Sequence, residues 1–224
     1  MKFKINKLRS LKSIAIFLMV FIAVLYVRDV SGFEIEAGYF KQLNDSENFG
    51  PSDGIKVRAG GANVYAWLSG EHARWSLADQ PFGYLDIAGA GIGFRKKLDG
   101  LSLFVEAGWY LPLNSPNRKL YPVSGDLGDR VDIWLNQEYA DTLGARHFDY
   151  YTVKISGNYG GSAGAAYRYE LSRRLSVNAE ASYRLLSMPL WADGKMNDSD
   201  IAWCRYEDQS LSGVAINIGI HWEF

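Results

Sequence analysis

Cysteine is almost absent from this sequence, because Cys204 is the only one among 224 residues. A single cysteine cannot form an internal disulfide, and its position far from the N-terminus excludes a lipid-modified N-terminal cysteine. The apolar run at residues 14–27 is also short, with 14 residues against the ~20 that a membrane-spanning helix needs. These absences remove disulfides as a source of stability and disfavour a helical membrane anchor.

An excess of basic charge is missing as well. When residues 1–32 are set aside, 18 Lys and Arg face 24 Asp and Glu, which gives a net charge of about −6. Proteins that bind nucleic acids present positive patches to the phosphate groups. The acidic balance of this chain therefore predicts no nucleic-acid partner.

The N-terminal segment has the three parts of a secretory signal peptide. A start rich in lysine and arginine precedes the apolar run, and the small residues Ser31 and Gly32 follow it. We expect residues 1–32 to be a signal peptide that is cleaved after Gly32, and residues 33–224 to form one domain. An uncleaved membrane anchor is the alternative.

Apolar and polar residues alternate along most of the domain, with the period of a strand that has two different faces. The alternating segments predict eight strands, near residues 33–42, 54–60, 63–72, 83–97, 101–112, 149–171, 175–187 and 211–224. Short turns at 98–100 and 172–174 contrast with longer links elsewhere, as in membrane barrels with periplasmic turns and extracellular loops. The predicted fold is all-β, an eight-stranded antiparallel up-and-down transmembrane β-barrel with long extracellular loops.

Aromatic residues of the apolar face fall at two levels along the predicted strands, as expected for the two interfaces of a bilayer. One level comprises Phe33, Phe94, Tyr167, Tyr169, Trp222 and Phe224, and the other comprises Tyr39, Trp109 and Tyr183. A soluble barrel of the lipocalin kind has the same alternation with its faces inverted, and it is the alternative. The two aromatic levels and the unequal links favour the membrane barrel.

The C-terminal segment 216–224, Ile-Asn-Ile-Gly-Ile-His-Trp-Glu-Phe, alternates strictly and ends on phenylalanine. It resembles the signal by which the assembly machinery recognises outer-membrane barrels, and the whole domain resembles small barrels of the OmpA and OmpX kind. The resemblance implies a location in the outer membrane, among bilayer lipids and lipopolysaccharide. It also implies that Trp222 and Phe224 form the assembly signal.

Charged residues lie on the predicted inner face of several strands. They are Glu34, Glu36, Lys56, Arg58, Asp86, Arg95, Glu106, Arg168, Glu170, Glu180, Arg184, His221 and Glu223, and the principal candidates among them for a charge network are Arg95, Glu106, Arg168, Glu180 and Arg184. Eight strands leave an interior just wide enough for side chains, and an unpaired charge there is costly. We expect these residues to form a network of ion pairs across the lumen, with a narrow ion path as the alternative.

The two longest predicted loops carry the features of a surface. Within 113–148, apolar residues at helical spacing predict a short helix, and Trp134 and Tyr139 on it are candidate contacts for an extracellular protein or host ligand. Alternatively, this helix packs on the barrel rim. The loop at 187–210 is rich in acidic residues, but its spacing does not match a calcium loop, so we expect a solvated loop, with a divalent-ion site as the alternative.

No clean catalytic constellation is present. Barrel enzymes that modify lipid A use His, Ser and a carboxylate. Two sets contain these residue types, but no motif supports either of them: His147 with Asp149 and Ser156, and His72 with Ser69 and Glu71. We therefore predict no catalytic, metal-binding or cofactor-binding residues. The function expected is a structural or surface-interaction role, similar to that of an adhesin, with a lipid A-modifying enzyme or a narrow channel as alternatives.

Overall fold

The computed structural model describes residues 32–46, 48–77, 80–114, 118–120, 150–196 and 199–224. No helix occurs among them, and so none that could cross a membrane. The described residues form eleven strands, which are β1 (Glu34–Asn44), β2 (Phe49–Gly60), β3 (Val64–Leu77), β4 (Gln80–Leu98), β5 (Leu101–Pro112), β6 (Arg118–Leu120), β7 (Tyr150–Ile155), β8 (Asn158–Glu170), β9 (Leu175–Met196), β10 (Ser199–Ser210) and β11 (Gly213–Glu223).

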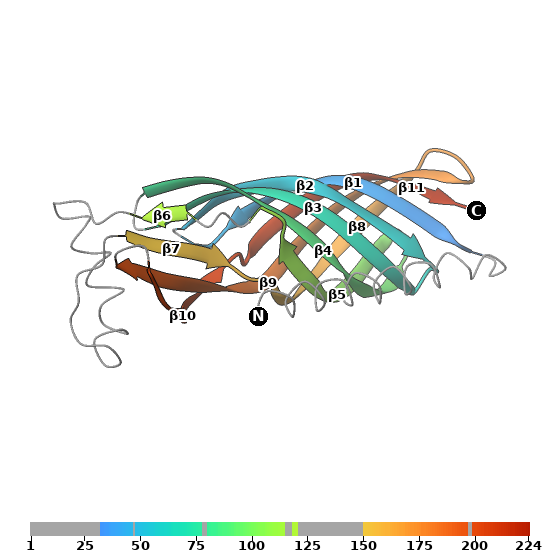
Figure 1. The fold of residues 1–224 in the computed structure, drawn as a ribbon. Coiled ribbons are helices and arrows are strands. Elements are labelled where there is room, and N and C mark those ends of the chain that lie inside the picture. Colours follow the sequence, from blue (N-terminus) through green and yellow to red (C-terminus); the bar gives the residue numbers. More distant parts are fainter. Residues whose placement is uncertain (1–31, 47, 78–79, 115–117, 121–149, 197–198) are drawn as a thin grey trace.

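Eight of these strands close into a barrel (Figure 1). Each strand pairs with the next in the order β1, β2, β3, β4, β5, β8, β9 and β11, and β11 pairs back with β1. Every pairing is antiparallel. The predicted eight-stranded up-and-down barrel is confirmed.

One end of the barrel, called here the turn end, holds the short connections. These are residues 61–63, 99–100 and 171–174. The turn between β4 and β5 has positive φ at both Asp99 (40°) and Gly100 (88°), the conformation that matches the twist of hairpin strands. The first and last barrel strands also meet here, where the Phe224 N–H donates to the Phe33 carbonyl at 3.0 Å.

At the opposite end, called here the far end, the strands run longer than predicted. β2 begins at Phe49 and not near 54, β3 continues to Leu77, and the link between β3 and β4 is only residues 78–79. Segment 50–54 contains Gly50, Pro51 and Gly54, and β2 accommodates them with a register shift between Phe49 and Ser52. The links predicted at 43–53 and 73–82 are therefore shorter than expected, because paired strands occupy most of these residues.

The predicted strand 149–171 divides into β7 and β8 at residues 156–157. β8 stays in the barrel wall, while β7 pairs with the distal part of β9 and with β6. The predicted loop 187–210 is instead a hairpin of β9 and β10. Together β6, β7, β9 and β10 form a sheet extension beyond the barrel, on the left in Figure 1. The predicted helix with Trp134 and Tyr139 lies outside the described residues.

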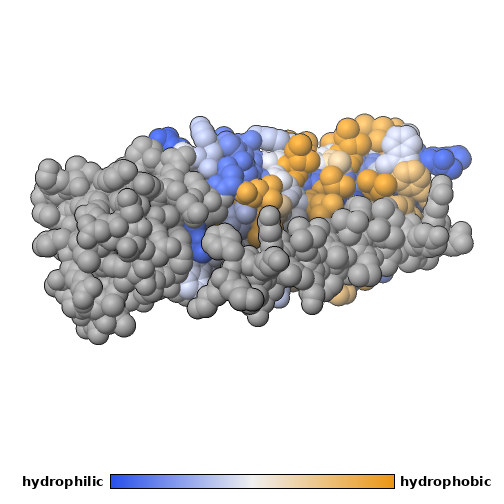
Figure 2. Space-filling view, in the orientation of Figure 1, coloured by the Kyte–Doolittle hydropathy of each residue, from blue (hydrophilic) through white to orange (hydrophobic). Residues whose placement is uncertain are grey.

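The outer face of the barrel wall is apolar. Ile218 on β11 is 63% exposed, and leucines, valines and isoleucines on neighbouring strands are exposed in the same way. Figure 2 shows them as an apolar band with hydrophilic side chains on either side. The exposed aromatics that were assigned to the two levels are Tyr39, Phe94, Trp109, Tyr167, Tyr169, Tyr183, Trp222 and Phe224.

Inside the barrel, large aromatic rings of β3 and β5 lie over glycines of nearby strands. A Cβ atom on Gly93 would meet the Tyr65 ring at 2.3 Å, and one on Gly108 would meet the Trp67 ring at 2.5 Å. Large rings thus lie over small residues, so that the rings fill a narrow lumen. Because the rings occupy much of the lumen, the charged side chains have little space and can contact one another only at certain levels of the barrel.

Candidate functional site

The centre of the lumen is organised around Arg58 of β2, which is 3% exposed. Its guanidinium donates to Glu106 through Nε at 2.8 Å and to Glu180 through Nη2 at 2.9 Å, and Nη1 donates to Glu36. The group also lies between two rings, with its carbon 5.6 Å from the centroid of Tyr65 and 5.2 Å from that of Phe104. Arginine suits this position because its planar fork can bind several carboxylates at once.

Glu106 on β5 is the most fully bonded carboxylate of this centre. Besides Arg58, it accepts hydrogen bonds from Lys56 Nζ at 2.8 Å, Ser162 Oγ at 2.8 Å and the Tyr65 hydroxyl at 3.2 Å. A buried carboxylate is tolerated only when its lone pairs find donors. The four partners come from β2, β3 and β8, so this one side chain ties together strands on different sides of the barrel.

A second layer of charges lies toward the turn end. Arg95 of β4 donates to Glu36 at 2.8 Å, while Glu34 of β1 accepts from Lys97 at 2.5 Å and from Arg168 at 3.3 Å. Glu36 connects this layer to Arg58. The two layers therefore form one continuous set of ion pairs through half of the lumen.

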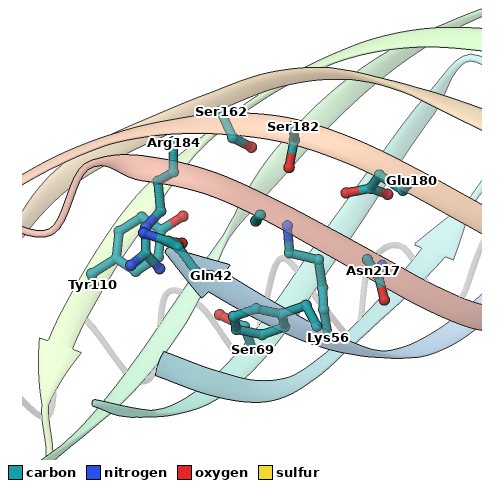
Figure 3. A pocket seen from close by; sticks show the side chains of 11 residues that line it. Gln42, Lys56, Ser69, Tyr110, Ser162, Glu180, Ser182, Arg184 and Asn217 are labelled. Atoms are coloured by element: carbon teal, nitrogen blue, oxygen red, sulfur yellow. The ribbon is translucent and has the colours of Figure 1, made fainter. Parts of the chain in front are cut away.

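A third layer lies toward the far end. Arg184 of β9 binds Glu71 of β3, with Nη2 2.9 Å from Oε1, and the same carboxylate oxygen accepts from Ser52 Oγ at 2.5 Å. The guanidinium also donates to the backbone carbonyl of Leu211. The side chains of this layer and of the centre converge on a small cavity, with Tyr110, Gln42 and Asn217 on its wall (Figure 3).

Above the third layer, the far end of the barrel is filled by apolar side chains. Trp75, Leu85 and Leu190 are fully buried there. The Phe49 and Trp75 rings stack with centroids 6.3 Å apart. Other fully buried members of this group are Ile87, Leu186, Met188 and Leu211. This group, called here the far-end core, caps the charged lumen with a packed apolar plug.

The free space inside the barrel is very small. The cavity in Figure 3 offers about 20 Å³ to the centres of water molecules, and a second cavity beside Arg95 and His221 offers about 10 Å³. A volume of about 10–15 Å³ by this measure holds one water. Asn217 Oδ1 has no hydrogen-bond partner and lines the larger cavity, so a water there would satisfy it. The described interior is filled rather than open.

The structure distributes the five predicted lumen residues over these layers. Glu106 and Glu180 meet at Arg58, Arg95 joins them through Glu36, and Arg168 lies at the turn end. Arg184 is separate and pairs with Glu71. The sequence did not indicate that Arg58 is the central arginine of the network. Glu71 was not assigned to the inner face, although it follows Tyr65, Trp67 and Ser69 at alternate positions of β3.

Asp86 lies on a different face from the one the sequence suggested, and one candidate catalytic combination is divided between the two faces of β3. Asp86, expected inside, is on the outer face of β4, and its Oδ1 lies 2.6 Å from Nδ1 of His72 on β3. Ser69 and Glu71 point inward while His72 points outward, so the combination of His72 with Ser69 and Glu71 is wrong. His147 and Asp149, of the other combination, lie outside the described residues.

Trp222 and Phe224 lie at the turn end of β11, on the outer face. Both rings are exposed, and their centroids are 6.3 Å apart. Phe33, the residue before β1, packs against Phe224, with centroids 6.2 Å apart. The proposed assembly signal therefore lies at the seam where the first and last strands meet.

Comparisons with known proteins give only distant likenesses. No family model and no curated protein matches this chain. Among solved structures, Neisserial surface protein A is 11% identical, with 87% of this chain and 98% of that chain covered and a TM-score of 0.44. The outer membrane protein W of E. coli is 10% identical over 87% and 98%, with a TM-score of 0.41. The Yersinia pestis outer membrane protein Ail is 13% identical over 87% and 100%, with a TM-score of 0.35.

Proposed function

We propose that this chain is an exported outer-membrane β-barrel that acts as a solid anchor and presents a surface-interaction element, in the manner of an adhesin. The barrel would span the bilayer beside lipopolysaccharide, with the turn end in the periplasm and the sheet extension outside the cell. Residues 1–32 would serve as the signal peptide.

The distribution of polarity supports the membrane location. The outer wall is apolar on neighbouring strands, with exposed side chains such as Ile216, Ile218 and Ile220, while the interior holds buried Arg58 and Glu106. A soluble barrel has the opposite arrangement. An exposed apolar band of this extent would aggregate in water but suits a hydrocarbon environment.

The observation that carries the anchor role is the filled lumen. Ion pairs occupy the interior from Glu34 to Arg184, and the far-end core closes it above them. Transport through so small a barrel needs an open path, and such lumens are normally packed. A passive channel is thus the less favoured function.

The sheet extension supports the surface role. The strands β7, β9 and β10 continue well beyond the barrel wall, and the far-end core beneath them gives the extension a rigid base. Trp134 and Tyr139 in the adjoining segment remain the proposed partner contacts, since aromatic anchors dominate binding interfaces.

A deletion of residues 126–144 tests the surface role. Cells that display the intact chain and cells that display the deletion would be compared for binding to extracellular matrix and serum proteins. We expect binding to fall with the deletion while the amount of heat-modifiable protein in the outer-membrane fraction stays constant. Equal binding by both would remove this segment from the proposed function.

A further inference from the structure

A cluster of three potential metal ligands lies at the turn end, across the seam between the first and last barrel strands. His221 and Glu223 are two residues apart on β11 and share a face, and Glu34 of β1 is the direct cross-strand partner of Glu223. One ligand atom from each of the three lies within 4.8 Å of the other two. The ligands come from opposite ends of the chain, so no local sequence motif indicated them.

His221 is the strongest sign that this cluster lacks a component. Its side chain is 1% exposed, yet its Nε2 has no hydrogen-bond partner. The same atom faces the cluster and lies 3.8 Å from Glu34 Oε2, beyond hydrogen-bond distance. A buried polar atom without a partner is costly and uncommon in native proteins.

Glu223 gives a second sign. Its carboxylate has no ion pair in the described part of the chain, although it lies directly opposite the carboxylate of Glu34. Two like charges in direct cross-strand opposition are destabilising. A cation between them would convert this repulsion into attraction.

From these observations we infer that Glu34, His221 and Glu223 bind a divalent transition-metal ion, with Zn²⁺ as the best match. One imidazole nitrogen and two carboxylate oxygens, with a water completing the coordination, are typical of zinc. Calcium and magnesium prefer a shell of oxygen atoms only. The ion would link β1 to β11 and hold the closed barrel at its seam.

Three basic side chains compete with the ion for Glu34. Arg168 Nη2 lies 3.3 Å from Glu34 Oε2 and 3.1 Å from His221 Nδ1, Lys97 Nζ lies 2.5 Å from Oε1, and Arg95 Nη1 lies 3.8 Å from Oε2. Ligation through Nε2 puts the ring proton on Nδ1, so Arg168 must turn away from the ring. Its side chain is 16% exposed at the open end of the barrel, which gives it a route to solvent.

The test is zinc binding by the purified chain, refolded in detergent micelles and stripped of metal, in competition with a chromophoric chelator. We expect one Zn²⁺ per chain, and a rise of several degrees in the temperature at which the folded gel band is lost. Glu223→Gln and His221→Gln should each weaken binding about tenfold or more. Arg168→Gln should strengthen it, because it removes one competing cation, the one that also contacts His221.

Two variants serve as controls. Glu170→Gln removes an exposed carboxylate from the same end of the barrel, and His72→Gln removes a histidine from the outer face; both should bind zinc like the unmodified chain. Only variants that show the folded gel band would be compared, and Glu223→Gln, an exposed position, keeps the test available if His221→Gln fails to fold. Absence of stoichiometric zinc binding, or equal binding by Glu223→Gln, would overturn the inference.

Discussion

The charged lumen and the far-end core fill the same barrel by opposite means. In the lumen, Arg58 and Arg184 hold carboxylates from strands on other sides of the wall. In the far-end core, Trp75, Leu85 and Leu190 exclude water by packing alone. Ion pairs need matched partners and leave a large penalty when one partner is lost, whereas apolar packing loses stability roughly in proportion to the volume removed. The charged lumen therefore specifies how the strands are arranged, and the far-end core closes the end of the barrel.

The largest effect should follow from Arg58→Met. Loss of the guanidinium leaves Glu36, Glu106 and Glu180 buried with fewer partners, which should lower the free energy of unfolding by about 3–5 kcal/mol. Urea titration in micelles, followed by the heat-modifiable gel shift, would measure it. Arg173→Met, at an exposed turn, is the matched control and should be near neutral; equal effects of both variants would contradict the hub role of Arg58.

The far-end core should respond less strongly. Leu85 is fully buried, and Leu85→Ala should cost about 3 kcal/mol through lost burial and a residual cavity. We expect protease sensitivity to appear first in the sheet extension, while the strands at the turn end remain folded. Uniform loss of structure in both regions, measured by hydrogen exchange, would show that the two regions are not separable.

The ring-over-glycine packing should give a smaller effect. Gly93→Ala introduces a Cβ atom 2.3 Å from the Tyr65 ring, and such overpacking typically costs about 1–3 kcal/mol. Gly70→Ala is the control, because nothing lies within 4 Å of its added Cβ atom. Equilibrium unfolding should separate the two variants, and a Gly70→Ala cost as large as that of Gly93→Ala would argue against the packing explanation.

The smallest effect on the finished barrel should come from Phe224→Ser. The ring is exposed on the outer face and contacts only Phe33 and Trp222 among the aromatic rings described. We expect a reduced amount of protein in the outer membrane and little change in the unfolding of the protein that does insert. Quantitative blotting of membrane fractions checks this expectation, and an unchanged yield would exclude Phe224 from the assembly signal.

Alternation predicted the wall of the barrel well because each strand has one apolar outer face and one face toward the polar lumen, so period and polarity coincide. Alternation did not identify strands whose two faces have similar polarity. Residues 187–210 looked like an acidic loop but form the hairpin of β9 and β10, since beyond the barrel wall both faces of a strand can be polar. The start of β2 was missed for another reason. Segment 50–54 contains two glycines and Pro51, which are uncommon inside strands, and a register shift accommodates them.

The partners of the interior charges could not be predicted from the sequence. Inward direction follows from the position of a residue in its strand, but the partner depends on the strand register and on which strands face each other across the lumen. Arg58 and Glu106 are 48 residues apart, and Arg184 and Glu71 are 113 apart. Only the closed barrel brings these pairs together.

The central claim, that the barrel is a filled anchor, is tested most directly by the conductance of the purified, refolded chain in a planar lipid bilayer. The ion pairs of the lumen and the far-end core predict a silent membrane at moderate voltage, with insertion verified by the folded gel band of protein recovered from liposomes. Steady, reproducible single-channel currents from the unmodified chain would contradict the account.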